Sequence, residues 1–185
     1  MKRLTTLTLL MILAIPVAGL AKDMTGKYGL GYFHNDAPVG ARFWLSPVLG
    51  VDLGLGFESQ NVYVGTEKET ATSFWVEAGF PYVIVPSERA NFFVRPGVTF
   101  AQLDDRAYGL GDNLDEKWTK VTFTLTPGAE VFFGDHFSLT AGHGIAIDMV
   151  SVPDDVSGPR GGESETTIRT FDGSVTYFGF HFYFK

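Results

Sequence analysis

Histidine is the residue from which most catalytic and metal sites in this chain would have to be built, because the sequence contains no cysteine. No two histidines have the spacing of a metal-ligand motif. The four lie scattered along the chain: His34, His136, His143 and His181. We therefore expect no catalytic residue, no cofactor site and no metal site.

Two glycine-containing motifs also fail as ligand sites. Gly29-x-Gly31 lies within a strand pattern, whereas a nucleotide-binding loop must precede a helix. Residues 109–115 carry oxygen ligands but lack the full calcium-loop pattern, so a flexible acidic loop is the better interpretation. The motif residues are Gly109, Gly111, Asp112, Asn113 and Asp115.

His143 is the residue that fits its surroundings least well. It shares one face of an alternating segment with apolar residues, namely Leu139, Ala141, Ile145 and Ile147. A ring that must hydrogen-bond is costly on an apolar face, and most costly if that face meets lipid. Either a bulge at Gly142 or Gly144 turns it inward, or the histidine has a function.

The end of the chain indicates the kind of element that carries these residues. From Thr176 to Lys185 every second residue is aromatic, and a period of two places four phenylalanines on one face of a strand. A row of four phenylalanines needs an apolar surrounding, which lipid supplies. We interpret the segment as the last strand of a membrane barrel.

Eight alternating segments of about ten residues each can be traced, which is the strand length of a membrane barrel. The clearest spans 118–133, with one apolar face and one small, polar face. The sequence thus predicts an all-β, eight-stranded, antiparallel up-and-down transmembrane β-barrel. Its segments lie near 26–33, 38–45, 48–58, 72–85, 91–103, 118–133, 137–150 and 170–184.

The connections alternate between short and long, as in outer-membrane barrels with short periplasmic turns and longer extracellular loops. The short ones are Ser46-Pro47, 86–90 and 134–136, and the expected long loops are 60–71, 104–117 and 151–169. Both termini should therefore lie on the periplasmic side. The loop 151–169, rich in proline, glycine and aspartate, is expected to be mobile.

The start of the chain predicts export. Residues 1–21 have a basic start, an apolar core and a small-residue exit, which are the parts of a secretory signal peptide. We expect one domain after it, a barrel over 22–185. Loss of Lys2 and Arg3 would change the formal net charge from -7 to -9, which argues against a nucleic-acid partner.

Several charged residues fall on the face that should point into the barrel: Arg42, Asp52, Glu77, Arg95, Lys120, Glu130, Asp148 and, near a mouth, Asp172. An eight-stranded barrel is just wide enough for side chains to fill it, and a buried charge must be paired. We expect a network that plugs the lumen, with Arg95 and Glu130 at similar depth. A path for ions or water is the alternative.

Three prolines fall inside predicted strands: Pro81, Pro96 and Pro127. Each removes a hydrogen-bond donor from the strand ladder. We expect Pro96-Gly97 and Pro127-Gly128 to share one bulge.

Aromatic residues near the strand ends should form girdles at the two membrane interfaces, although Trp44 faces inward. They are Tyr28, Tyr32, Trp44, Tyr82, Phe92, Trp118 and Phe137.

Taken together, the signal segment, strand count, alternating connections and aromatic last strand resemble the small outer-membrane β-barrel proteins of Gram-negative bacteria, the OmpA and OmpX type. The resemblance implies the cell outer membrane, contact with its lipids and lipopolysaccharide, and insertion by the barrel-assembly machinery. That machinery reads a final aromatic residue, which here is displaced by Lys185. A structural or surface-interaction role through the extracellular loops, with a possible extracellular partner, is implied.

Two other functions stay open. His143 resembles the wall histidine of lipid A deacylases, but the position of their serine is Ile145 here, and the nearest serines, at 138 and 151, are remote. A soluble, secreted lipocalin-like carrier would need an apolar interior and a polar exterior. The predicted faces are the reverse of that.

Overall fold

The computed structural model describes residues 22–33, 37–64, 66–108, 117–151, 164–170 and 175–184. The expected signal peptide, Asp172, Lys185 and the 109–115 motif lie outside these ranges. Among the described residues, no helix is both long and apolar enough to cross a bilayer.

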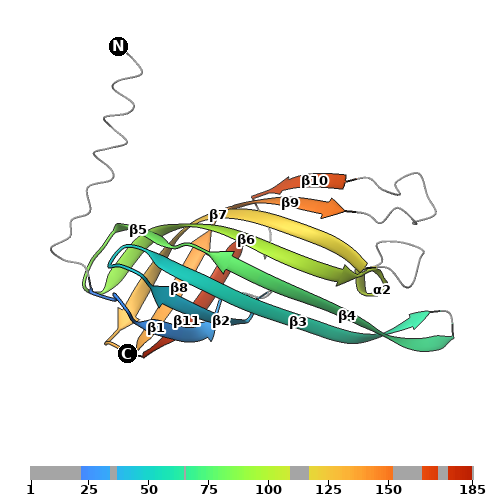
Figure 1. Cartoon of the computed structure of the whole chain (residues 1–185), viewed down its shortest axis with the longest axis horizontal. Helices are drawn as coiled ribbons and strands as arrows, with labels where there is room; N and C mark the ends of the chain where they lie inside the picture. The colour runs from blue at the N-terminus through green and yellow to red at the C-terminus, as the bar shows by residue number, and fades with distance from the viewer. Residues whose placement is uncertain are drawn as a thin grey trace, which may run out of the picture.

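Antiparallel strands form a closed barrel, because the first strand pairs with the last (Figure 1). Three barrel strands are each split into two segments (β4 with β5, β8 with β9, β10 with β11), so eleven segments make eight strands. The elements are β1 (Tyr28–Tyr32), β2 (Val39–Trp44), β3 (Gly50–Val64), β4 (Glu67–Gly79), β5 (Tyr82–Val85), β6 (Ala90–Asp104), α2 (Asp105–Tyr108), β7 (Lys117–Phe133), β8 (Phe137–His143), β9 (Ile145–Ser151), β10 (Ser164–Arg169) and β11 (Thr176–Phe184).

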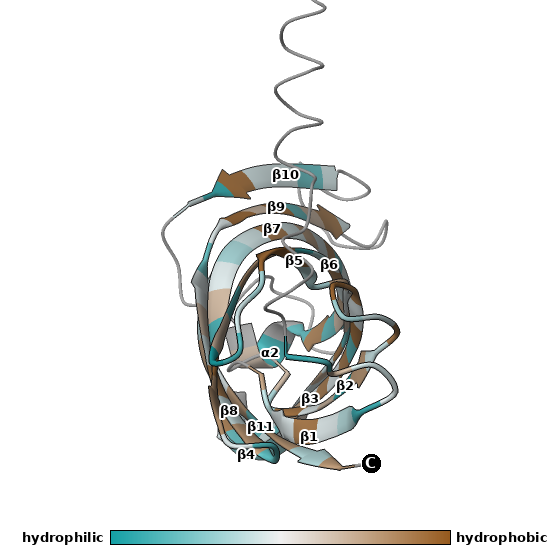
Figure 2. Ribbon diagram, turned by 90° about the vertical axis from the view of Figure 1, so that its left-hand side faces the viewer, coloured by the Kyte–Doolittle hydropathy of each residue, from teal (hydrophilic) through white to brown (hydrophobic). Residues whose placement is uncertain are grey.

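Burial alternates along the strands as the sequence predicts. On β11, Tyr177, His181 and Tyr183 point inward and are buried, while the four phenylalanines are exposed on the outer wall. Figure 2, which looks along the barrel, shows polar and apolar residues alternating on the strands. The predicted all-β, eight-stranded barrel is confirmed. The carrier alternative is wrong, because here the charges lie inside and the apolar residues outside.

Two connections are shorter than expected. Asn61–Val64 pairs with Glu67–Thr70, so most of the predicted loop 60–71 is a continuation of the β3–β4 hairpin. Ser164–Arg169, within the predicted mobile loop 151–169, is strand β10. Polar residues fall on both faces of each segment, so the two segments lack the regular alternation of apolar and polar residues by which the other strands were found.

The expected shared bulge is also wrong. β6 and β7 pair in unbroken register through both sites, with Pro96 opposite Leu125 and Pro127 opposite Val94. The Pro96 carbonyl accepts a 2.9 Å hydrogen bond from the Phe80 amide, so the Pro96 backbone faces the short interruption between β4 and β5. Since no ladder bond is needed there, the missing proline donor costs little.

Most of the aromatics expected in the girdles lie on the outer wall. Tyr28 stacks on Phe184 at 5.6 Å between ring centroids, and Phe137 packs on Phe182 at 5.1 Å. Trp44 points inward and is buried, as its alternation predicts. Trp118 is a correction, because it lies opposite Leu103 on the inner face.

The alternation on β7 can be measured with single cysteines, since the chain has none of its own. We expect a spin label on Phe123→Cys to be relaxed mainly by oxygen, which concentrates in lipid. A label on the neighbouring Thr122→Cys, which faces the lumen, should show low oxygen accessibility. Equal oxygen accessibility at both positions would contradict the barrel wall assigned to β7.

Candidate functional site

A network of ion pairs fills the lumen between β2, β3, β4, β6 and β7. Arg42 donates two hydrogen bonds to Asp52, from Nε to Oδ1 at 2.6 Å and from Nη2 to Oδ2 at 2.9 Å. Its Nη1 donates to Glu130 Oε2 at 3.0 Å. All three side chains are fully buried. Arg42 therefore joins two carboxylates from opposite walls of the barrel.

Arg95 extends the network toward the loop end. Its Nε donates to Asp52 Oδ2 at 2.6 Å, and its Nη2 donates to Glu77 Oε1 at 2.5 Å. Asp52 thus accepts from both arginines. The expectation that Arg95 lies level with Glu130 is wrong, because Glu130 pairs with Asn91 and Arg95 pairs with Thr126. We call Arg42, Asp52, Glu77, Arg95 and Glu130 the lumenal network.

Hydroxyl donors complete the environment of Glu130. Its Oε1 accepts from Ser138 Oγ and from Tyr183 Oη, each at 2.6 Å. Tyr183 Oη in turn accepts from Trp44 Nε1 at 3.3 Å. The network holds three carboxylates against two guanidinium groups, and these neutral donors add to the one guanidinium bond that Glu130 receives from Arg42. Sequence alternation placed Ser138 and Tyr183 inside but gave them no role.

The end of the barrel where the termini lie is closed by apolar side chains and by the first described residues. Met24 is fully buried and belongs to a cluster with Trp44, Phe93 and Tyr183. Outside it, Lys22 pairs with Asp135 at 3.1 Å, and the hydrogen bond from Lys22 lowers the pKa of the exposed Asp135 carboxyl. The N-terminal residues thus help to close the lumen.

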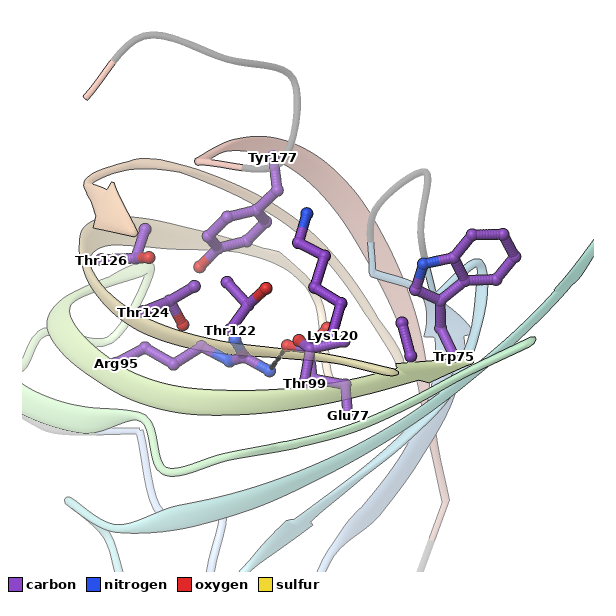
Figure 3. Close-up of a pocket in the computed structure, with 10 residues that line it drawn as sticks. Trp75, Glu77, Arg95, Thr99, Lys120, Thr122, Thr124, Thr126 and Tyr177 are labelled. Carbon is purple, nitrogen blue, oxygen red and sulfur yellow. Dashed lines mark hydrogen bonds and ion pairs between the residues drawn. The ribbon is translucent and has the colours of Figure 1, made fainter. Parts of the chain in front are cut away.

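Toward the loop end the lumen contains a polar cavity, which we call the vestibule (Figure 3). Its wall includes Thr99, Thr122, Thr124 and Thr126 from β6 and β7, with Trp75 on the far side and the buried hydroxyl of Tyr177 facing the threonines. Arg95 and Glu77 of the lumenal network form its inner end. The vestibule is therefore a cavity that ends at the network.

A second charge cluster lies beside the vestibule on β7, β9 and β10. Asp148 accepts from Thr122 Oγ1 at 2.6 Å and pairs with Lys120 at 3.4 Å and with Arg169. The predicted inward orientation of the charged residues is thus confirmed for Lys120 and Asp148, as it is for the five residues of the lumenal network. Lys120, Asp148 and Arg169 come from three neighbouring strands, so this second cluster lies along one side of the lumen.

His143 stays on the outer wall, so neither expected explanation holds in full. No bulge turns it inward, because its register with Thr176 and that of Gly142 with Gly128 are regular. Its Nδ1 lies 2.6 Å from Thr176 Oγ1 on the neighbouring strand. This hydrogen bond satisfies one ring nitrogen within the wall. It gives a structural reason for a histidine among apolar residues.

The described residues bring together no group of three potential metal ligands among His, Cys, Asp and Glu. Of the remaining histidines, His136 Nδ1 lies 3.1 Å from the Tyr183 carbonyl oxygen, and His181 is buried beside Thr140 in the lumen. His34 lies outside the described residues.

Comparison with known proteins gives one match. A family model described as "Outer membrane protein beta-barrel domain" matches residues 14–182. No curated protein and no solved structure was found to match the chain.

The lumenal network predicts a large loss of stability when one partner is removed. Arg42→Met should lower the free energy of unfolding by about 3–5 kcal/mol, because it leaves Asp52 and Glu130 with fewer donors in a dry lumen. Urea unfolding in detergent micelles, followed by tryptophan emission, measures this. Lys68→Met, on the exposed hairpin, is the control and should change little. A loss below about 0.5 kcal/mol for Arg42→Met, the range of an ordinary surface substitution, would contradict the role given to the network.

Proposed function

Because the chain belongs to the family of outer-membrane protein β-barrels, we propose that it is a non-catalytic surface-interaction protein of the outer membrane. Contact is made by the elements at the loop end, and the barrel serves as their anchor. The observation that carries this proposal is the β3–β4 hairpin, which continues well past the ends of β1 and β2 (Figure 1).

The outer part of this hairpin is built for contact with water-soluble molecules. It presents three charged residues on β4, Glu67, Lys68 and Glu69, and on β3 an aromatic ring, Tyr63, that is 75% exposed near the turn. Exposed tyrosine is enriched at protein–protein interfaces, and charged residues around it can form the polar rim of such an interface. The hairpin thus offers the chemistry of a contact surface.

The hairpin is also braced against the neighbouring connection. Arg106, in α2, donates to Glu69 Oε2 at 2.8 Å, and Gln60 Nε2 donates to the Ala107 carbonyl at 3.3 Å. Asp104 holds Arg106 in place through two further bonds of 2.8 Å. A braced surface loses less conformational entropy on binding than a free loop, which favours recognition.

The rest of the chain supports the same proposal. The lumenal network fills the barrel, which favours an anchor over a channel. The apolar outer wall suits contact with outer-membrane lipids and lipopolysaccharide, and membership of the family supports insertion by the barrel-assembly machinery as part of the proposal. The deacylase alternative has weaker support, because the serine position of that pattern is Ile145 here and the hydroxyl beside His143 is that of a threonine.

Shortening the hairpin separates the role of the barrel as an anchor from the role of the hairpin in surface contact. Replacing residues 61–70 by Asn-Gly keeps the pair Gln60–Ala71 and forms a tight turn. We expect this variant to remain in the outer membrane with a heat-dependent gel mobility, yet to behave like a null strain in growth competition against wild type. Arg106→Gln is the control for the contact between α2 and the hairpin. This variant keeps the hairpin, so a strain that carries it should lose only part of its fitness. If the shortened barrel restores the null strain fully, the role lies in the barrel itself and the proposed surface contact is wrong.

A further inference from the structure

The hydroxyl of Tyr177 is a buried polar group that the protein leaves without a partner. The side chain is 9% exposed, and its Oη makes no hydrogen bond to any described residue. Figure 3 shows the hydroxyl pointing into the vestibule, toward Thr122, Thr124 and Thr126. A buried hydroxyl without a partner is unfavourable, and native proteins rarely contain one. A small ligand in the vestibule would complete the hydrogen bonding of Tyr177.

A guanidinium nitrogen faces the same cavity. Arg95 uses Nε and Nη2 for its bonds to Asp52 and Glu77, and neither bond uses Nη1. The space beside Nη1 is free because residue 97 is a glycine. A Cβ on Gly97 would lie 2.7 Å from Thr124 Oγ1 and 3.2 Å from Arg95 Nη1. A hydroxyl group and a cationic N–H group therefore border one small space on the inner face of β6.

Among the described residues, the charged side chains that line the vestibule are two cations and one anion. Lys120 and Arg95 are positive, and Glu77, which is negative, is bonded to Arg95. Asp148 pairs with both Lys120 and Arg169, so it offsets only part of the charge of Lys120. The rest of the polar lining consists of tyrosine and threonine hydroxyls, most of which can donate a hydrogen bond into the cavity. The lining thus has one positive charge in excess and many donors, which favours a bound anion.

The size of the vestibule limits which anion can bind. Its free volume is about 20 Å³, which is enough for one particle about as large as a water molecule. A halide ion such as chloride is of that size, whereas phosphate groups and molecules that carry a carboxylate are several times larger. A water molecule also fits, but it leaves the excess positive charge of the lining without a partner. Size and charge together therefore favour chloride.

We propose that the vestibule binds one chloride ion from the external medium, held by Tyr177 Oη, Thr124 Oγ1 and Arg95 Nη1. Lys120 supplies further positive charge, and the ion gives Tyr177 the partner that the protein lacks. The ion stops at the lumenal network, because bonded side chains fill the lumen there and the carboxylates of the network repel an anion. The site therefore holds chloride and does not conduct it across the membrane.

Replacing chloride by gluconate, an anion too large for the vestibule, tests the proposal at constant ionic strength. The purified protein is folded in detergent, and the midpoint of its thermal unfolding is measured by gel mobility. A ligand that binds only the folded barrel stabilises it. We expect the midpoint to rise saturably with chloride, by about 5–10 °C at 100 times the dissociation constant. An unchanged midpoint would mean that the vestibule holds water only, and the proposal would be wrong.

Two variants assign the effect of chloride to the vestibule. Tyr177→Phe removes a hydroxyl without a protein partner, so in gluconate this variant should be at least as stable as wild type. Its half-saturating chloride concentration should rise at least about tenfold, because the ion loses a hydrogen bond. Lys120→Met should weaken binding in the same direction, and Asp148 keeps its pair with Arg169 in this variant.

Tyr28→Phe is the matched control, because it removes a tyrosine hydroxyl from the outer wall. This variant should keep the chloride response of wild type. An equal response in wild type and all three variants would place the ion elsewhere and overturn the proposal.

Crystals grown in bromide locate the ion directly, since bromide scatters X-rays anomalously. We expect a peak within hydrogen-bonding distance of Tyr177 Oη and Arg95 Nη1. Bromide found only on the outer surface of the protein would contradict the proposed site.

Discussion

Arg42 and Arg95 bind three carboxylates inside a lumen that is too narrow to leave these charges to water, and the rest of the barrel is arranged around these contacts. An ionised group moved into such a space loses several kcal/mol of hydration, which only close, well-oriented partners offset. The partners come from β2, β3, β4, β6 and β7, so the contacts form fully only when these strands are correctly paired. The network therefore favours one register of the barrel over its neighbours, since a shift of one residue would turn every charge toward lipid.

The same constraint separates the lumen into parts with different properties. Below the network, toward the termini, Met24, Trp44 and Tyr183 fill the barrel with a conventional apolar core. Above it, threonine hydroxyls, Trp75 and Lys120 line the vestibule, and Lys120 is paired with Asp148. The strands of the wall follow this division. All eight enclose the filled part, whereas β1 and β2 end below the level of Trp75.

Alternation along the chain was sufficient to predict the barrel, its strand number and the inward orientation of charges such as Asp52 and Glu130. It could not predict which charges meet, because a period of two fixes the face of a residue and leaves its depth to the strand register. Arg95 was therefore matched with Glu130, although the register places Asn91 opposite Glu130. The bond between His143 and Thr176 was missed for the same reason, since the two residues are 33 positions apart in the chain. The outer β3–β4 hairpin and β10 were read as loops because polar residues on both faces carry no such signal. Pro96 was predicted to lie in a bulge because the sequence does not show that the neighbouring strand is interrupted at Phe80, opposite Pro96.

Ion conductance across a planar lipid bilayer tests the central claim, that the network fills the lumen, most directly. The purified wild-type protein, with its folded state verified by gel mobility before and after heating, is inserted into the bilayer and held under voltage in concentrated salt. A filled lumen predicts no resolved openings and a current equal to that of the bare bilayer. A stable conductance that appears with each insertion would show that ions pass Arg42 and its carboxylates, and would contradict the structure proposed for the lumen.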